Sequence, residues 1–144
     1  MPSKITTGFK ALIAAAQKEI EEIPVEEALK LAGRDDVVIV DIRDPRELEI
    51  EGRIPGSFHA PRGMLEFWID PESPYFKPVF GEDKKFVFHC AAGWRSALAT
   101  QAVQRMGLKP VAHIAGGFAA WKKAGGPIEK PEPRKEPWTG DKKD

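Results

Sequence analysis

Apolar and polar positions follow two different periods along this chain. Between residues 8 and 23, apolar side chains recur at steps of three and four, which predicts an amphipathic helix that Pro24 ends. Further short helices are predicted by the runs "VEEALKLAG", "DPRELEIEG", "SALATQAVQRMG" and "FAAWKKAGG". In "DPRELEIEG", Asp44 is suited to the N-cap position and Pro45 to the first helical position, so two signals mark where that helix begins.

Three runs rich in β-branched and aromatic residues interrupt the helical pattern: "DVVIVDI", "KKFVFHC" and "PVAHI". Their continuous apolar character is typical of strands buried on both faces, and "RIPGSFHAP" predicts a shorter strand after a Pro-Gly turn. Because strands alternate with helices, we expect an α/β fold around a mainly parallel sheet. In such sheets, functional sites form beyond the carboxyl ends of the strands.

The two ends of the chain differ from its middle. We expect residues 1–22 to form an N-terminal amphipathic helix extension and residues 23–126 to form one domain. Residues 127–144 are rich in proline and charge and have no apolar periodicity, which predicts a disordered tail in which Trp138 is the one candidate for docking.

The connector "MLEFWIDPESPYF" is unusually aromatic. This pattern favours a satellite hydrophobic cluster under a long loop. The alternative is a pocket wall formed by Phe67 and Trp68, or a docking surface for a protein partner.

Composition and charge exclude several classes of function. The 144 residues suit one domain, and 22 Lys and Arg balance 22 Asp and Glu, so no overall field favours nucleic acid or a membrane surface. The longest apolar run near the N-terminus is too short for a signal sequence or a membrane span. One cysteine excludes an internal disulfide, and the three histidines lack the spacing of zinc ligands. We therefore expect a reduced, cytoplasmic protein without a metal or an organic cofactor.

Cys90 lies where the second strong strand ends and a helix is expected to begin, near Arg95 or Ser96. Residues 91–93 are small, so successive backbone N–H groups can converge on one centre and form an anion-binding nest at the helix N-terminus. A thiol at such a centre is favoured in its nucleophilic thiolate form. The alternative is an inert core cysteine, which would need no nest.

Arg95 and the histidines have alternative roles. Arg95 either holds the oxygens of an oxyanion or pairs with a strand-end carboxylate such as Asp41. His89 points to the opposite face of its strand from Cys90, which makes it a poor general base and favours a structural role. His59 lies near the turn and is a candidate for the site wall. The remaining histidine, in "PVAHI", is expected to be hydrogen-bonded core.

These motifs resemble those of the single-domain rhodaneses, a family of sulfurtransferases. The resemblance rests on "DIRDPRELEIEGRIPGSFHAP" and "FVFHCAAGWRSALATQAVQRMGLKPVAHIAGGFAAW", which keep the family's order and spacing. It implies a three-layer α/β/α fold with a mainly parallel five-stranded central sheet, here with an additional N-terminal helix.

The resemblance also implies a reaction. Cys90 would take a sulfane sulfur from a donor such as thiosulfate, hold it as a persulfide and pass it to cyanide or a thiol acceptor. Asp41 and Arg43 match the family's strand-end pair and are expected to be structural. The anion-binding loop would consist of Ala91, Ala92, Gly93, Trp94, Arg95 and Ser96. Two alternatives are a persulfide carrier in a protein sulfur relay and a non-catalytic rhodanese module for interaction or redox sensing.

Some positions depart from the family's pattern. Arg53 replaces the histidine that is common in the family's turn, and Ala92 replaces a lysine of the long two-domain thiosulfate users, so strong thiosulfate turnover is not implied. Trp94 either walls the pocket or lies on the surface. Four residues separate Cys90 from Arg95, one fewer than in the Cys-x5-Arg phosphatases, and this smaller ring favours a cysteine-bound sulfur over a phosphoryl group.

Overall fold

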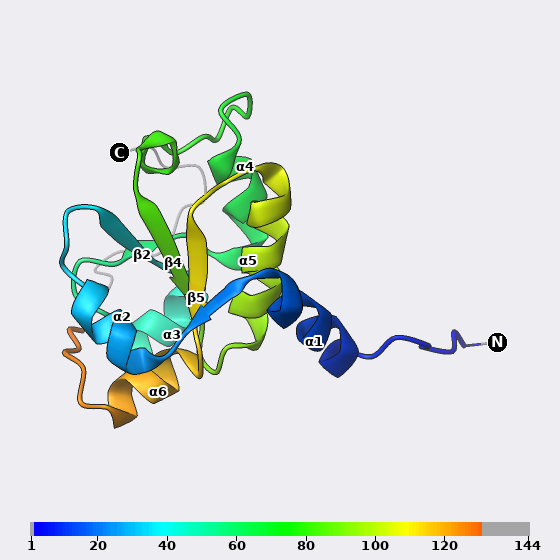
Figure 1. Ribbon diagram of the computed structural model, residues 1–144, viewed down its shortest axis with the longest axis horizontal. Helices are drawn as coiled ribbons and strands as arrows, with labels where there is room; N and C mark the ends of the chain where they lie inside the picture. The colour runs from blue at the N-terminus through cyan, green and yellow to red at the C-terminus, as the bar shows by residue number, and fades with distance from the viewer. Residues whose placement is uncertain (1, 131–144) are drawn as a thin grey trace.

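The computed structural model describes residues 2–130, and a five-stranded sheet lies at its centre (Figure 1). Every neighbouring pair of strands is parallel, in the order β1-β5-β4-β2-β3, which confirms the expected sheet. The strands are β1 (Glu21–Ile23), β2 (Val37–Asp41), β3 (Phe58–His59), β4 (Lys85–His89) and β5 (Val111–Ile114).

Helices cover both faces of the sheet. Helices α4 and α5 pack on one face, α2 and α6 pack on the other, and α1 lies outside α5 (Figure 1). The α-helices are α1 (Phe9–Glu19), α2 (Val25–Leu31), α3 (Pro45–Glu51), α4 (Leu65–Ile69), α5 (Trp94–Met106) and α6 (Gly117–Lys123). Two 3₁₀ turns, η1 (Arg62–Met64) and η2 (Pro78–Gly81), complete the connector between β3 and β4.

The apolar run of β4 accounts for the position of this strand at the centre. Phe86 and Phe88 pack into the core on the α5 side, and Val87 packs on the α6 side. All three side chains are fully buried. Because successive strand residues point to opposite faces, a continuous apolar run buries both faces at once. The carboxyl end of β4 therefore lies within the sheet, between β2 and β5, and delivers Cys90 to that edge.

The N-terminal boundary differs from the expectation. The predicted helix over residues 8–23 ends at Glu19, and residues 21–23 instead form the edge strand β1, which pairs with β5. Ile20 packs with α1 and α5, whereas Ile23 packs on the opposite side of the sheet. The backbone is already extended at Ile20, and successive extended residues point to opposite sides, so Ile20 and Ile23 are buried on opposite faces of the sheet. The domain boundary predicted at residue 23 thus cuts through β1.

The C-terminal boundary also moves. The sequence pattern places residues 127–130 in a disordered tail, but Arg53 and Glu129 exchange two backbone hydrogen bonds of 2.8 and 2.9 Å. Ile128 packs against the α6-side core, and the Trp121 indole N–H donates to the carbonyl of Pro127 at 2.8 Å. These contacts hold the segment on the domain. Residues 131–144, including Trp138, lie outside the described residues.

Helix α3 begins as its sequence predicts. The Asp44 carboxylate accepts the N–H groups of Arg46 and Glu47, and the Glu47 carboxylate accepts the N–H of Asp44, which together form a capping box. Pro45 occupies the first turn. This cap fixes the direction of α3 as it leaves the carboxyl end of β2.

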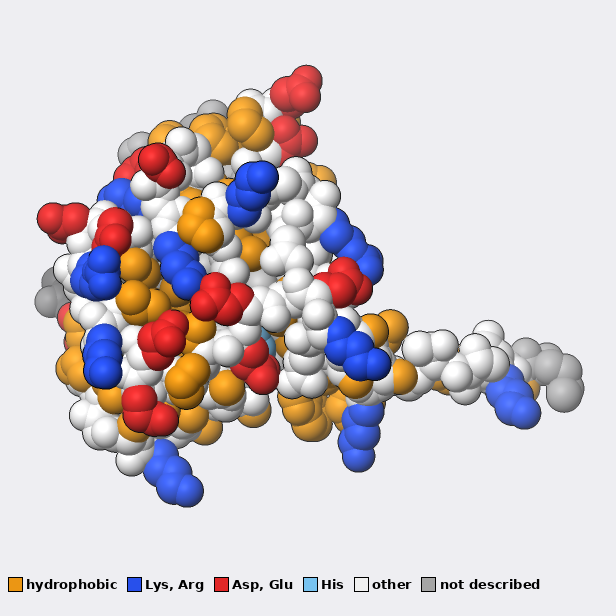
Figure 2. All heavy atoms as spheres, viewed as in Figure 1, with side chains coloured by type: hydrophobic (Ala, Val, Ile, Leu, Met, Phe, Trp, Pro, Cys, Tyr) orange, Lys and Arg blue, Asp and Glu red, His pale blue; other side chains and the backbone are white. Residues whose placement is uncertain are grey.

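The surface carries charges of both signs close together. Figure 2 shows Lys and Arg side chains interspersed with Asp and Glu over one face of the molecule, in keeping with the zero net charge. None of the helices within residues 2–130 combines the length and the apolar character that a membrane crossing requires.

The first turn of α6 packs directly on the backbone that follows β4. Phe118 N–H donates to the carbonyl of Cys90 at 2.8 Å, and Ala119 N–H donates to that of Ala91 at 3.0 Å. Gly117 has a φ of 59°, and a Cβ there would lie 2.6 Å from the carbonyl oxygen of Cys90. Only glycine therefore permits this approach.

Replacing Gly117 by alanine tests this contact. Gly125 is a matched control, because its φ of 80° is also positive but no atom lies within 4 Å of an added Cβ. Gly125→Ala should cost about 1–2 kcal/mol from backbone conformation alone. Gly117→Ala should lower the free energy of unfolding in urea by about a further 1–3 kcal/mol, because the backbone must move. Equal losses would contradict the close approach.

Candidate active site

Cys90 lies in the loop between β4 and α5, and its sulfur accepts backbone hydrogen bonds. The N–H of Gly93 lies 3.2 Å from Sγ, and the N–H of Ser96 lies 3.3 Å from it. Gly93 caps α5 in the left-handed conformation, with a φ of 102°. The helix begins at Trp94, one or two residues earlier than expected, because this glycine turns the chain so sharply. Amides that point at a sulfur stabilise negative charge on it.

The thiol is nearly inaccessible from outside the loop. Cys90 is 1% exposed, and its Sγ lies 3.5 Å from the hydroxyl oxygen of Ser96, which is itself fully buried. Of the other predicted loop residues, Ala92 is exposed, and Trp94 is 58% exposed. The Trp94 ring packs on Phe9 of α1, with ring centroids 4.9 Å apart. Trp94 thus connects the N-terminal helix to the loop from the outside.

Arg95 faces a carboxylate of α3. Its guanidinium donates two hydrogen bonds of 2.8 Å to the two carboxylate oxygens of Glu47. These two hydrogen bonds lower the pKa of the Glu47 carboxyl to about 2. They also raise the pKa of Arg95 above its ordinary value. Arg95 therefore has the second of its two expected roles, pairing with a carboxylate, and not the first, binding an oxyanion. The carboxylate is Glu47 and not Asp41, because Asp41 is already occupied.

Asp41 binds the other arginine of this edge. The Arg43 guanidinium donates to Asp41 at 2.8 Å and to the carbonyl of Gly52 at 2.8 Å, and it lies 4.2 Å from the centroid of the Phe118 ring. Both charged side chains are buried. Burial raises the pKa of Asp41, but the hydrogen bonds from Arg43 and the charges of His89 and Arg43 together outweigh it, so the pKa lies below its usual range. The pair joins β2, the turn before β3 and α6 behind the loop.

His89 and His59 support this framework. His89 is fully buried with Nε2 3.6 Å from Asp41, and burial lowers its pKa, which favours the neutral ring. His59 Nε2 lies 2.6 Å from the carbonyl oxygen of Arg43 and donates to it. These contacts fit the structural role expected for His89 and give His59 a structural role as well.

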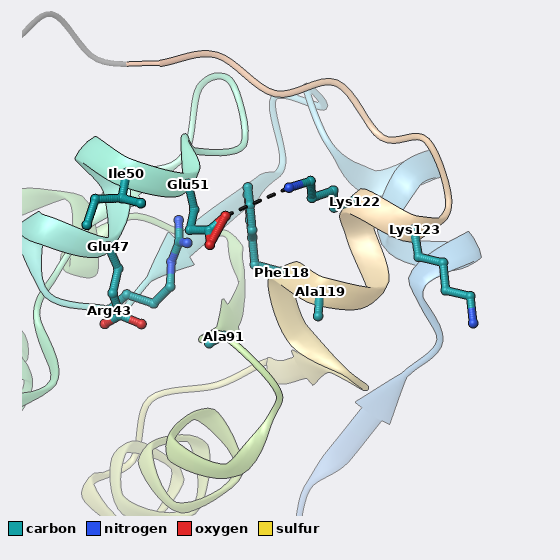
Figure 3. A pocket seen from close by; sticks show the side chains of 9 residues that line it. All are labelled: Arg43, Glu47, Ile50, Glu51, Ala91, Phe118, Ala119, Lys122 and Lys123. Carbon is teal, nitrogen blue, oxygen red and sulfur yellow. Dashed lines mark ion pairs between the residues drawn. The ribbon is translucent and has the colours of Figure 1, made fainter.

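A pocket of about 550 Å³ opens beside the loop. Figure 3 shows Ala91 at its base, with side chains of α3 on one side and of α6 on the other. An ion pair of 3.8 Å between Lys122 and Glu51 crosses the pocket. The lining residues are Arg43, Glu47, Ile50, Glu51, Ala91, Phe118, Ala119, Lys122 and Lys123.

The predicted pocket wall of His59, Phe67 and Trp68 is not part of this pocket. Phe67 is 55% exposed, and Trp68 packs edge-on against Phe58 at a centroid distance of 6.3 Å. The aromatic connector thus contributes to a hydrophobic cluster, the first of the two interpretations of its sequence. The α3 and α6 walls could not be found from the sequence because no local pattern shows that these two helices face each other.

Within residues 2–130, no three His, Cys, Asp or Glu side chains come together as metal ligands would. No pattern in the sequence points to a role for Glu22. This residue of β1 lies at the outer end of a polar chain that passes through His113 and Ser96 to Cys90. The chain depends on the pairing of β1 with β5, which was not predicted.

The Glu47–Arg95 pair predicts a pH-dependent contribution to stability. Because folding lowers the Glu47 pKa from 4.5 to about 2, the pair stabilises the fold above pH 4.5 and is lost as the pH falls from there towards 2. At neutral pH, Glu47→Gln should lower the free energy of unfolding by about 1 kcal/mol, given screening by solvent.

The measurement is urea unfolding of both proteins at several pH values. Glu51→Gln, at the end of the same helix, is the control and should change stability by less than about 0.5 kcal/mol. A Glu47→Gln deficit that stays constant down to the acid limit would show that the ion pair is not its cause.

Comparisons with known proteins agree with this geometry. The model of the rhodanese-like domain matches residues 24–124. A sulfurtransferase from Allochromatium vinosum is 32% identical over 103 residues, covering 72% of this chain and 88% of that protein. The thiosulfate sulfurtransferase GlpE from Pseudoalteromonas translucida is 31% identical and is covered to 90%.

Solved structures show the same fold. A protein of unknown function from Rhodopseudomonas palustris, described as a possible tyrosine phosphatase, is 64% identical with a TM-score of 0.87, covering 90% of this chain and 99% of that one. The polysulfide-sulfur transferase homodimer from Wolinella succinogenes is 28% identical with a TM-score of 0.64, covering 89% and 91%. With its parallel sheet, its cysteine loop and a domain match over most of its length, the chain belongs to the rhodanese-like family of sulfurtransferases.

Proposed function

We propose that this protein transfers sulfane sulfur through a persulfide on Cys90, with a persulfide or polysulfide as its preferred donor. The observation that carries the proposal is the pair of N–H groups, from Gly93 and Ser96, that point at Sγ within 3.3 Å. Amides fixed in this way stabilise a sulfur anion without any movement during the reaction. The sulfurtransferase relatives support the reaction class.

The reaction has two displacement steps. The Cys90 thiolate attacks the sulfane sulfur of the donor, the donor's sulfur bond breaks, and the leaving group departs with its electron pair. Cys90 then carries a persulfide anion. In the second step, an acceptor thiolate or cyanide attacks the outer sulfur, and Cys90 leaves as the thiolate. Each step is a thiol–disulfide type exchange, for which a good leaving thiolate matters as much as a good nucleophile.

The charges of the site favour a persulfide donor over thiosulfate. Thiosulfate presents three charged sulfonate oxygens and releases sulfite, so it needs cationic donors beside the sulfur. However, Arg95 is bound by both oxygens of Glu47, Arg43 is bound by Asp41, and Lys122 pairs with Glu51. Ala92, an exposed position of the loop, supplies no charge. The structurally similar protein from Wolinella succinogenes is a polysulfide-sulfur transferase, which supports this class of donor. We propose that thiosulfate is a poor substitute donor.

A phosphatase reaction is less well supported. The four-residue ring between Cys90 and Arg95 is small for a phosphoryl group, and the Arg95 guanidinium is already paired with Glu47. Phosphoryl transfer needs free cationic groups around the equatorial oxygens. A test with p-nitrophenyl phosphate should therefore show no Cys90-dependent turnover.

Intact-mass measurement tests the persulfide directly. After incubation with glutathione persulfide and removal of the donor, the protein should gain the mass of one sulfur atom, and cyanide should remove it. Cys90 is the only cysteine, so the adduct can be assigned without digestion. Cys90→Ser should abolish both the adduct and turnover while leaving the unfolding transition in place. Turnover that survives in Cys90→Ser would exclude the mechanism.

The donor class can be tested at Ala92. Ala92→Lys should raise kcat/KM for thiosulfate about tenfold, because a charged hydrogen bond to an anion contributes about 1.5–3 kcal/mol. Ala92→Gln is the control for side-chain length without charge and should give no such gain. If the two variants behave alike, or if the wild type already prefers thiosulfate to glutathione persulfide, the proposed donor preference is wrong.

A further inference from the structure

A continuous chain of polar side chains leads from the thiol to the edge of the sheet. Cys90 Sγ lies 3.5 Å from Ser96 Oγ, which lies 2.9 Å from His113 Nδ1, and His113 Nε2 lies 2.7 Å from the carboxylate of Glu22. Cys90, Ser96 and His113 are buried, whereas the Glu22 side chain is 36% exposed. The chain thus connects the buried sulfur with a carboxylate that reaches solvent.

The direction of the hydrogen bonds follows from the chemistry of the groups. A carboxylate only accepts, so His113 donates its Nε2–H to Glu22. The neutral ring then has a lone pair on Nδ1, which accepts the hydroxyl proton of Ser96. The lone pairs of Ser96 Oγ are left to face the sulfur, so the Cys90 thiol donates to them.

The surroundings keep the ring neutral before reaction. Burial lowers the pKa of His113, and the hydrogen bond and charge of Glu22 only partly oppose this effect. A neutral imidazole is the form that accepts a proton.

The surroundings contain few other charges. On α1, the Gln17 amide donates to the Glu22 carboxylate at 3.2 Å. Glu22 on β1 contacts the ring directly, and Cys90 after β4 is connected to it through Ser96. The other charged or titratable groups of β1, β4 and α5 have partners of their own: Arg95 pairs with Glu47, Glu21 with Lys85, and Arg105 with Glu19, while His89 lies beside Asp41.

We propose that His113 is the proton acceptor for the Cys90 thiol, acting through Ser96, and that Glu22 orients its ring. Before Cys90 attacks, its proton moves to Ser96 Oγ and the hydroxyl proton of Ser96 moves to Nδ1, which leaves the thiolate that makes the first displacement. The resulting imidazolium is paired with Glu22. When Cys90 later leaves as the thiolate, the two protons move back along the same path, so the protein gains and loses no proton over the cycle. Ser96 contacts the reacting sulfur, whereas His113 and Glu22 are positioning residues that act through it.

The proposed role of His113 is to activate the Cys90 thiol. It rests on the proposed function only in taking a sulfane-sulfur donor as the group that Cys90 attacks. The test is the rate of Cys90 alkylation by iodoacetamide from about pH 5 to about pH 10, a range that spans the ordinary ionisation of histidine and cysteine. The variants are His113→Asn, Ser96→Ala and Glu22→Gln. Glu21→Gln is the matched control, because Glu21 is the neighbouring carboxylate of β1 and pairs with Lys85 on the exposed edge.

The wild-type rate should reach a plateau near neutral pH. In His113→Asn and Ser96→Ala, the rate at pH 7 should fall by about a hundredfold, the lower end of what a positioned base contributes. It should then rise about tenfold per pH unit and approach the wild-type rate at alkaline pH, where the thiol ionises to solvent. The rate of Glu22→Gln at pH 7 should lie between that of the wild type and that of His113→Asn. The rate of Glu21→Gln should match the wild type at every pH.

A structural role for these residues gives a different result. If the chain only holds the loop, the variants should lose the same factor at every pH, or lose nothing, and either outcome overturns the proposal. Thermal unfolding identifies a variant that does not fold, and the partly exposed Glu22→Gln, which keeps the shape of the side chain, then decides the question. Persulfide loading is measured separately on the same proteins. Shifted alkylation profiles without loading would refute the proposed function alone, and loading with unshifted profiles would refute the relay alone.

Discussion

The site depends on the fixed direction of two carbonyl groups. The carbonyls of Cys90 and Ala91 turn away from the sulfur and accept the first amides of α6, from Phe118 and Ala119. With these carbonyls held outward, the chain turns at Gly93, and the following N–H groups point inward at Sγ. A sulfur surrounded by fixed N–H donors lies in a site suited to an anion before any substrate arrives.

Charged pairs hold this backbone without adding net charge to the pocket. Asp41 and Arg43 are buried together behind the loop, and Glu47 binds Arg95 at its side. Removing one partner of a buried pair leaves an uncompensated charge, which typically costs about 3–5 kcal/mol. Arg43 and Arg95 therefore support the structure of the loop, and the groups that point at the sulfur are backbone amides. This division is the basis of the proposed preference for a persulfide donor over thiosulfate, whose sulfonate oxygens need cationic donors.

The sequence was sufficient where one local pattern decides the structure. The N-cap at Asp44, the central strand that leads to Cys90 and the small-residue loop follow from neighbouring residues alone. The sequence was insufficient where contacts between distant segments decide which structure a residue adopts. Ile20 and Ile23 fit a helical step, and only the free edge of β5 makes the second of them part of a strand. The partner of Arg95 and the alignment of His113 with Glu22 depend on the same tertiary packing.

A crystal structure of the protein after treatment with glutathione persulfide tests the central claim most directly, because it shows where the transferred sulfur lies. The account predicts one additional sulfur atom bonded to Sγ of Cys90, inside the loop and within hydrogen-bond distance of its backbone amides, with the Glu47–Arg95 pair unchanged. An unmodified Cys90 would contradict it. A modified Cys90 whose outer sulfur points away from the amides, or an Arg95 that leaves Glu47 to bind the new sulfur, would contradict it equally.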